Sequence, residues 1–278
     1  MLEEGFLQIL DKVYKERGLD FRQYKESSLR RRIKRRLGGR NVASCQEYLK
    51  VLDTDPEEYK RLADCLTIKV TDFFRNPEVW QILREGVLPE VIREKIKKIK
   101  ENEGFKPVLR IWSAGCATGQ EVYSMAILLD QLLRERKDDL EVIIWGTDID
   151  KESLLKAQQA EYKSDMIKGV PQKVLSNYFD FNDNFKLKSH VTGTVYFKSH
   201  DLVMNEPLRH MDMILCRNVV IYFERPLQEK VFMDFYHGLS GGGYLFLGKA
   251  ETLIGPAKQR FEVIDKRWRI YQKKEVVS

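Results

Sequence analysis

The sequence contains few residues of the kinds that bind metals or cross-link chains. Its 278 residues include only four cysteines and four histidines, and no two cysteines form a C-x-x-C pair. These residues are scattered along the chain, at Cys45, Cys65, Cys116, Cys216, His190, His200, His210 and His237. Because zinc sites and disulfide frameworks have characteristic ligand and cysteine spacings, the sequence predicts neither a metal centre nor a disulfide scaffold. We expect structural roles for all eight side chains.

Long apolar runs and a leader pattern are also missing. No stretch approaches the roughly 18 apolar residues of a membrane-spanning helix, and no basic-then-apolar pattern opens the chain. With 43% hydrophobic and 32% charged residues, the chain can bury one large core and one smaller core. We therefore expect a cytoplasmic, monomeric protein of one or two domains that does not insert into membranes.

The formal charge of +6 is concentrated near the N-terminus. Residues 29–40, L-R-R-R-I-K-R-R-L-G-G-R, hold seven basic residues and no acid. Leu29, Ile33 and Leu37 recur every four residues, which predicts a helix with one apolar stripe. The basic side chains that then face outward are Arg30, Arg31, Lys34 and Arg35.

The ends of this helix carry their own signals. Ser27 or Ser28 is expected to cap its start, and the pair Gly38-Gly39 to end it in the left-handed conformation. Arginines in the first turn oppose the helix dipole, so local stability does not explain them. The alternatives are a solvated basic face, a nucleic-acid surface or a docking face for another anionic partner. No aromatic residues interleave with the basic ones for base stacking, and we expect no nucleic acid as partner.

A strand, a glycine turn, a helix and a second strand are predicted between Val108 and Asp150. V-L-R-I-W is a short run of β-favouring residues, and Gly115 to Gly119 supplies the turn. Apolar residues of Met125 to Leu133 recur at helical spacing, and V-I-I-W at Val142 to Trp145 suits a strand buried on both faces. This order is half of a nucleotide-binding α/β fold.

The glycine turn differs from that of a dinucleotide site. G-x-G-x-x-G brings close-set glycines to a pyrophosphate, whereas Gly115 to Gly119 reads G-C-A-T-G and is followed by Glu121. A carboxylate repels pyrophosphate, so the turn suits a cationic ligand without phosphate, such as S-adenosylmethionine. Asp148, at the end of the second strand, is placed to accept hydrogen bonds from ribose hydroxyls. The alternative is a structural unit in which these residues only make turns.

Helices precede this region, and strands alternate with helices after it. Residues 1–26 are predicted as an amphipathic helix and a short connection through Gly18, and residues 45–51 and 56–66 as two further helices. Beyond Asp150 the alternation predicts an α/β sheet of about seven strands with helices on both faces. A hairpin is expected at Val191 to Phe197, where T-G-T lies between β-forming residues.

Polar residues follow two of the later predicted strands. Arg217 and Asn218 end the strand that starts at Met211, where open α/β sheets hold ligands. Asp201 and Leu202 follow the strand that ends at Phe197. The alternative for Asp201 is a helix cap before Leu202.

Three sequence blocks resemble the chemotaxis receptor methyltransferases (CheR-type). They are L-T-I-K-V-T-D-F-F-R-N-P at Leu66 to Pro77, W-S-A-G-C-A-T-G-Q-E-V-Y-S at Trp112 to Ser124, and C-R-N-V-V-I-Y-F at Cys216 to Phe223. With the R-R-I-x-R-R-L run, the resemblance covers nearly the whole chain. It implies a class I S-adenosylmethionine-dependent methyltransferase fold, Rossmann-like with about seven strands, with a small antiparallel β-subdomain insertion and a small all-α N-terminal domain before it.

The resemblance also implies domain boundaries. Residues 1–70 would form the all-helical domain with its basic substrate-docking helix, 71–106 a linker segment and connecting helix, and 107–278 the cofactor-binding domain with the β-subdomain at about 180–200. In some family members this subdomain binds a receptor-tail peptide through an extended hairpin loop. The loop here is short, and we predict no such site.

Site residues outside the turn follow from the resemblance. Thr71 and Arg75 would contact the amino-acid portion of the cofactor or the acceptor carboxylate, and Asp201 would meet the adenine. Tyr222 would hold the acceptor through its hydroxyl; the alternative is a core aromatic. Lys69 departs from the family, which commonly has Asn there, and is left out. The predicted cofactor-binding residues are Thr71, Arg75, Gly115, Glu121, Asp148, Asp201, Leu202, Arg217 and Asn218.

The function implied is methyl esterification of glutamate side chains on the acidic cytoplasmic helices of a chemoreceptor, with S-adenosylhomocysteine as product and no metal. A glutamate with a reference pKa of about 4.3 is already ionised at neutral pH, so neither acid nor base is required. Arg75 and Tyr222 are the predicted catalytic residues. The alternatives are an RNA methyltransferase acting through the basic helix and a non-catalytic cofactor or receptor binder.

Overall fold

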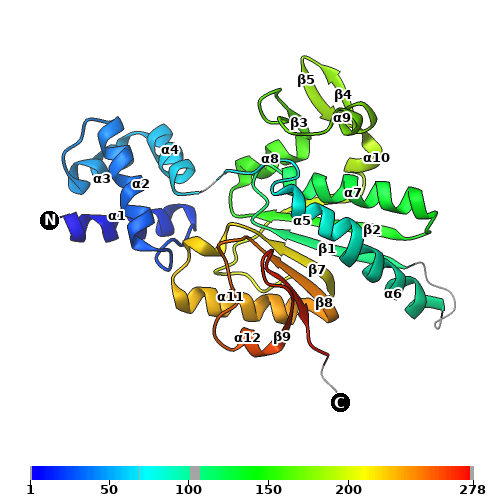
Figure 1. Ribbon diagram of the computed structural model, residues 1–278. Coiled ribbons are helices and arrows are strands. Elements are labelled where there is room, and N and C mark those ends of the chain that lie inside the picture. The colour runs from blue at the N-terminus through cyan, green and yellow to red at the C-terminus, as the bar shows by residue number, and fades with distance from the viewer. Residues whose placement is uncertain (1, 68, 101–106, 276–278) are drawn as a thin grey trace. The chain divides into compact units, whose positions relative to one another are not determined.

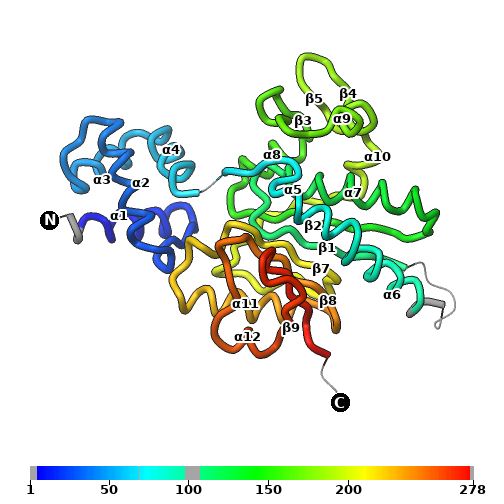
Figure 2. The backbone as a smooth tube through the Cα atoms, viewed as in Figure 1, coloured from blue at the N-terminus to red at the C-terminus, as the bar shows by residue number. Residues whose placement is uncertain are grey.

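A computed structural model of the protein describes residues 2–67, 69–100 and 107–275 (Figure 1). Parts of the predicted boundaries that fall on residues 1, 68, 101–106 and 276–278 lie outside this description. The chain divides into two compact units, which we call the helical unit (1–68 and 219–231) and the sheet unit (69–218 and 232–278). Figure 2 traces the same backbone in chain order.

Four helices and a later segment of the chain build the helical unit. The helices are α1 (Leu2–Arg17), α2 (Glu26–Gly39), α3 (Cys45–Thr54) and α4 (Pro56–Leu66), and the later segment holds the 3-10 turn η2 (Val220–Tyr222) and the start of α11 (Arg225–Gly238). The predicted stripe Leu29, Ile33 and Leu37 is buried in their common core, so that prediction is confirmed. Main-chain hydrogen bonds from Lys25 to the Tyr222 carbonyl (2.8 Å) and from Glu224 to Gln23 (2.9 Å) join the later segment to the N-terminal part.

The predicted end of α2 at Gly38-Gly39 is confirmed in position, but the predicted cap at its start and the left-handed conformation at its end are wrong. The helix begins at Glu26 after Lys25, and no side chain caps it. The pairing of Lys25 with the distant Tyr222 carbonyl fixes this earlier start, which a local serine signal does not anticipate. Neither Gly38 nor Gly39 has a positive φ; the left-handed residue is Asn41 (φ +53°), a residue type that tolerates this conformation.

The sheet unit is built on a seven-stranded sheet of order β6-β2-β1-β7-β8-β10-β9. Its strands are β1 (Val108–Ala114), β2 (Glu141–Asp148), β6 (Val195–Ser199), β7 (Met211–Cys216), β8 (Leu239–Leu247), β9 (Phe261–Asp265) and β10 (Ile270–Lys273). All neighbours are parallel except β10, which is antiparallel to β8 and β9. The chain order reverses beside β1, where an open α/β sheet holds its ligand.

Helices cover both faces of this sheet (Figure 1). The helical elements of the sheet unit are α5 (Pro77–Ile82), the π-helical turn η1 (Leu83–Val87), α6 (Leu88–Lys100), α7 (Gln120–Arg136), α8 (Lys151–Gln159), α9 (Gln172–Tyr178), α10 (Ser189–Thr192), α11 and α12 (Ala257–Arg260). Of these, α9 lies beside the smaller, three-stranded sheet (Figure 1). Alternate residues of β1 face opposite layers. Ile111 shares a core with Val87 and Met125, whereas the Trp112 ring lies 5.5 Å from that of Phe235 on α11.

A second, three-stranded sheet forms the antiparallel insertion. It consists of β3 (Glu161–Tyr162), β4 (Phe179–Asn182) and β5 (Asn184–Leu187), in the order β3-β5-β4, and so spans 161–187 rather than about 180–200. The predicted hairpin at Val191 to Phe197 is wrong, because Val195–Ser199 is β6 of the large sheet and runs parallel to β2. The Thr194 hydroxyl donates to the Val191 carbonyl at 3.0 Å, so the T-G-T run closes a turn after α10 instead of joining two strands.

Candidate functional site

The glycine turn after β1 is held against β2. The main-chain N–H groups of Gly115 and Cys116 both donate to the Thr147 carbonyl, at 2.8 and 2.9 Å. Gly119 has φ +89°, and a Cβ added there would lie 2.9 Å from the Cβ of Ala157 on α8. The turn therefore needs glycine at this position for both its conformation and its close packing.

Asp148 lies beside this turn at the carboxyl end of β2. Its Oδ2 accepts the Ala117 N–H at 2.8 Å and its Oδ1 accepts the Asp150 N–H at 2.9 Å. Burial raises the pKa of Asp148, and these two N–H donors oppose that rise. Each carboxylate oxygen can accept a second hydrogen bond, so Asp148 is fixed in place and can still accept a ligand hydroxyl.

Glu121, in the first turn of α7, is held between two side chains. The Ser113 hydroxyl donates to its Oε1 at 2.8 Å, and Nη1 of Arg217 lies 3.3 Å from its Oε2. The side chains of Arg217 and Glu121 are 3% and 14% exposed. The predicted acid, Glu121, is therefore present at the turn. Its carboxylate is paired with Arg217, which is also one of the predicted cofactor-binding residues.

Arg217 also reaches the segment that precedes α5. Its Nη2 donates to the Arg75 carbonyl at 3.0 Å and to Oδ1 of Asn76 at 2.8 Å. Its Nε is buried with no hydrogen-bond partner among the described residues. Arg217 thus links the first turn of α7 to this segment, which gives it a positioning role in addition to the predicted binding role.

The segment of residues 69–76, which we call the strap, carries Thr71 and Arg75, both half-buried. Its main chain is fixed at Phe74, whose N–H donates to the Ser124 hydroxyl at 2.9 Å. Nη1 of Arg75 donates to the Val70 carbonyl at 3.3 Å, within the strap itself. The strap therefore lies against the start of α7, near the predicted acid of that helix.

Asp201 is held by a local contact, and Asn218 by a residue further along the chain. Oδ1 of Asp201 accepts the Val203 N–H at 2.7 Å, so Asp201 closes a turn rather than capping a helix. Leu202, the predicted neighbour, is half-buried in this turn. The main chain of Asn218 (φ +64°) donates to Glu251 at 3.0 Å.

Two residues outside the predicted set hold segments of the candidate site. Glu251, which orients Asn218, lies 33 positions further along the chain. Nζ of Lys69, a residue that the family resemblance does not place in the site, lies 2.7 Å from Oδ2 of Asp150, two residues beyond Asp148. No spacing rule links either residue to the site, because each contact joins separate segments of the fold.

The basic side chains of α2 divide into two groups. Arg31, Lys34 and Arg35 are exposed. Arg30 is half-buried, with its guanidinium 4.4 Å from the centre of the Phe6 ring and an ion pair to Glu26. The predicted outward face is therefore carried mainly by the three exposed residues.

Two further arginines of α2 serve the helical unit itself. Nη1 of Arg32 donates to the Leu66 carbonyl at 2.6 Å, and its guanidinium lies 5.4 Å from the centre of the Tyr222 ring. Arg36 pairs with the buried Glu58 at 2.5 Å. Tyr222 belongs to the helical unit and Arg75 to the sheet unit, so their joint catalytic role stays a prediction.

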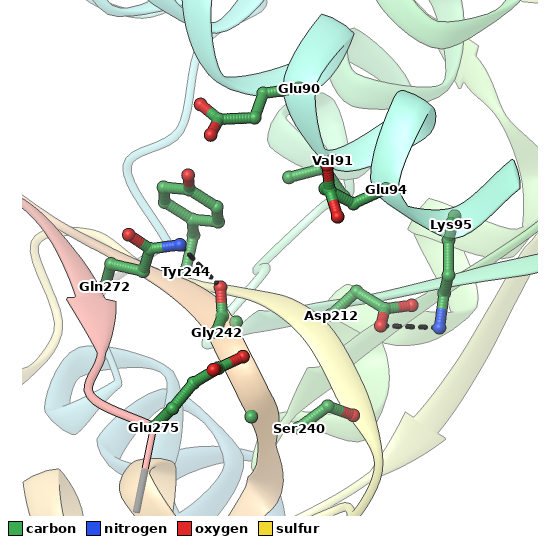
Figure 3. A pocket seen from close by; sticks show the side chains of 12 residues that line it. Glu90, Val91, Glu94, Lys95, Asp212, Ser240, Gly242, Tyr244, Gln272 and Glu275 are labelled. Carbon is green, nitrogen blue, oxygen red and sulfur yellow. Dashed lines mark hydrogen bonds and ion pairs between the residues drawn. The ribbon is translucent and has the colours of Figure 1, made fainter. Parts of the chain in front are cut away.

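A cavity of about 540 Å³ lies elsewhere in the sheet unit, beside α6 and the amino ends of β7 and β8 (Figure 3). Glu90, Glu94 and Glu275 line it, with Asp212 paired to Lys95 at 2.7 Å. Parallel strands start at this edge, whereas the glycine turn and Asp148 lie at the edge where they end. The cavity is therefore separate from the candidate site.

The residues present at the carboxyl edge fit S-adenosylmethionine by their chemistry. Asp148 offers accepting oxygens for ribose hydroxyls, and Glu121 offers a carboxylate for a cationic group. Across the described residues, no three His, Cys, Asp or Glu side chains gather as metal ligands, and no helix is long and apolar enough to cross a membrane.

The fold defines the class of protein: a class I methyltransferase domain with a small antiparallel insertion, preceded by a helical domain. Residues 69–270 match the family model described as CheR methyltransferase, SAM binding domain, and residues 4–67 match CheR methyltransferase, all-alpha domain. The chain belongs to the CheR methyltransferase family.

Individual relatives agree with this family. A chemotaxis protein methyltransferase of Listeria innocua is 30% identical over 257 residues, which cover 92% of this chain and 93% of that protein. A putative methyltransferase of Pseudomonas putida is 32% identical over 279 residues, or 95% of each chain. An uncharacterised 104.1 kDa protein of Rhodobacter capsulatus is 30% identical over 255 residues, which cover 91% of this chain but 26% of that protein.

Proposed function

We propose that this protein methyl-esterifies glutamate side chains on the cytoplasmic helices of a chemoreceptor, with S-adenosylmethionine as methyl donor. The observation that carries the proposal is the match of both parts of the chain to one methyltransferase family. The products are glutamate 5-O-methyl ester and S-adenosylhomocysteine. The relatives named as chemotaxis methyltransferases support a receptor as substrate.

The side chains of the sheet unit would hold the cofactor. Asp148 would accept hydrogen bonds from the ribose hydroxyls, and Asp201 would meet the adenine. Glu121 would face the cationic amino-acid end, together with Thr71 on the strap. Bound S-adenosylmethionine would supply an activated methyl group on its sulfonium sulfur. After transfer of the methyl group, the leaving group is the neutral thioether of S-adenosylhomocysteine.

The protein's task is then to orient the acceptor. Transfer of this methyl group to an ionised carboxylate would need no proton transfer, so the protein would need neither an acid nor a base. Holding the carboxylate in line with the methyl group and removing its water can lower the activation free energy by about 7–11 kcal/mol. Arg75, as a two-point donor, and Tyr222, through its hydroxyl, would hold the carboxylate.

The exposed basic residues of α2 would dock the chemoreceptor substrate. Arg31, Lys34 and Arg35 present positive charge on one helix, which suits an acidic helical surface. Their neighbours Arg32 and Arg36 are used inside the helical unit and are not available for docking.

The test is transfer of labelled methyl groups from S-adenosylmethionine to chemoreceptor-containing membranes, followed by release of methanol in alkali. We expect label on the receptor that is lost as methanol. Arg75→Ala and Tyr222→Phe should each reduce turnover while calorimetry shows cofactor binding mostly intact. Label on RNA instead of the receptor, or tight binding without a base-labile product, would reject the proposal.

A further inference from the structure

One ion pair connects the two segments that the proposed function assigns to the cofactor. Nζ of Lys69 lies 2.7 Å from Oδ2 of Asp150, and the two side chains are only 26% and 12% exposed. Lys69 begins the strap, which carries Thr71 and Arg75. Asp150 follows Asp148 by two residues. The pair therefore joins the start of the strap to the carboxyl end of β2.

Asp150 is itself fixed on both sides. It caps α8 by accepting the N–H groups of Glu152 and Ser153, at 3.2 and 3.3 Å, and the Ser153 hydroxyl at 2.5 Å. Its own N–H donates to Oδ1 of Asp148 at 2.9 Å. Burial alone would raise the pKa of Asp150, but the bonds from Lys69 and Ser153 outweigh it and lower the pKa. Asp150 is thus an ionised, rigid anchor for the lysine.

The remainder of the strap is fixed at its other end. The Phe74 N–H donates to Ser124, and Arg217 donates to the Arg75 carbonyl. Between Lys69 and Phe74, the Phe73 ring packs edge-on against Tyr162 at 4.9 Å between ring centres. The Tyr162 hydroxyl in turn donates to the Thr118 carbonyl of the glycine turn at 2.8 Å. Each end of the strap is therefore attached to an element that carries predicted cofactor contacts.

We propose that Lys69 is a positioning residue. Its pair with Asp150 holds the strap over the cofactor and slows release of the cofactor. The inference rests on the proposed function for the identity of the ligand. A positive charge next to Asp150 also offsets the negative charge that this carboxylate places near Asp148. Loss of the pair should therefore weaken binding of the cofactor without removing any group that touches the reacting atoms.

The test compares single and double variants by calorimetry with S-adenosylhomocysteine. Lys69→Met and Asp150→Asn should each weaken binding about three- to tenfold, and the double variant no further, because both remove one pair. Asparagine caps helices as well as aspartate does, so Asp150→Asn keeps the start of α8. Ser153→Ala, which removes a contact of Asp150 but leaves the pair, is the matched control and should bind within about twofold of the wild type.

Further readouts separate positioning from a loss of folding. Raising the salt from about 50 to about 500 mM should weaken binding by the wild type more than by Lys69→Met, because salt screens the pair. Lys69→Arg should restore most of the affinity. In the methyl-transfer assay, KM for the cofactor should rise while kcat changes less than about twofold.

Hydrogen exchange of the strap amides distinguishes this inference from the proposed function. In the protein without ligand, the amides of residues 70–74 should exchange faster in Lys69→Met and Asp150→Asn than in the wild type or Ser153→Ala. This result is independent of which ligand the site binds, whereas failure of the wild type to bind the cofactor would reject the proposed function alone. Unchanged exchange, or additive losses in the double variant, would overturn the role of Lys69.

Discussion

Replacing Arg217 by methionine should destabilise the sheet unit strongly, because it leaves a carboxylate without its partner. The guanidinium is 3% exposed and contacts Glu121, the Arg75 carbonyl and Asn76. Breaking a buried ion pair on one side costs about 3–5 kcal/mol. Glu121 is 14% exposed and keeps its bond from Ser113, so we expect the lower end, about 3 kcal/mol.

The size of this effect can be measured by thermal unfolding. In a domain of this size, about 3 kcal/mol corresponds to a fall of about 6–12 °C in the unfolding temperature. The double variant Arg217→Met with Glu121→Gln removes both charges and should recover more than half of that loss, while binding of the cofactor stays weak. Arg209→Met is the matched control in the same unit, because its pair with Glu206 is exposed and should contribute no more than about 1 kcal/mol.

Two results would refute this reasoning. If Arg217→Met unfolds within about 2 °C of the wild type, the pair with Glu121 is not the stabilising contact that its burial indicates. If the double variant is no more stable than Arg217→Met, the loss comes from the contacts to the strap rather than from the unpaired carboxylate.

Three further predictions concern the turn, the ribose acid and the docking face. Gly119→Ala places a side chain at φ +89° and in contact with α8, and should cost about 1–3 kcal/mol in unfolding free energy and weaken cofactor binding in calorimetry. Burial raises the pKa of Asp148 in the folded state, so this group favours the folded state at acidic pH and loses that contribution as pH rises through the raised pKa. Binding of the ribose hydroxyls by the carboxylate should weaken as pH falls, a trend that should be absent in Asp148→Asn. Arg31→Glu with Lys34→Glu should reduce receptor methylation about tenfold or more at low salt, with cofactor affinity unchanged; equal methylation would exclude this face as the docking surface.

Much of the central fold could be predicted because its signals are local. The run from β1 through the glycine turn to α7 and β2 carries its periodicities and its turn residues in one continuous stretch. The stripe Leu29, Ile33 and Leu37 is buried for the same reason, since helical spacing alone places these side chains on one face. The fold class followed from the alternation of such elements.

The errors have one cause, which is that distant partners override local signals. Val195–Ser199 contains good β-formers near a glycine, and only the available edge of β2 decides that they extend the large sheet. The helix α2 begins early, at Glu26, because the Tyr222 carbonyl accepts the N–H of Lys25. Neither partner can be identified from the spacing of nearby residues.

The sequence by itself determined the central strands β1 and β2, most of the helices and the identity of the acids at the turn, because backbone preferences and apolar periodicity act over a few residues. The tertiary structure alone decided which charges meet. Arg217 reaches the Arg75 carbonyl across 142 positions, and Lys69 reaches Asp150 from another segment of the chain. Such contacts depend on how packed elements bring side chains together, and this depends on the whole fold at once.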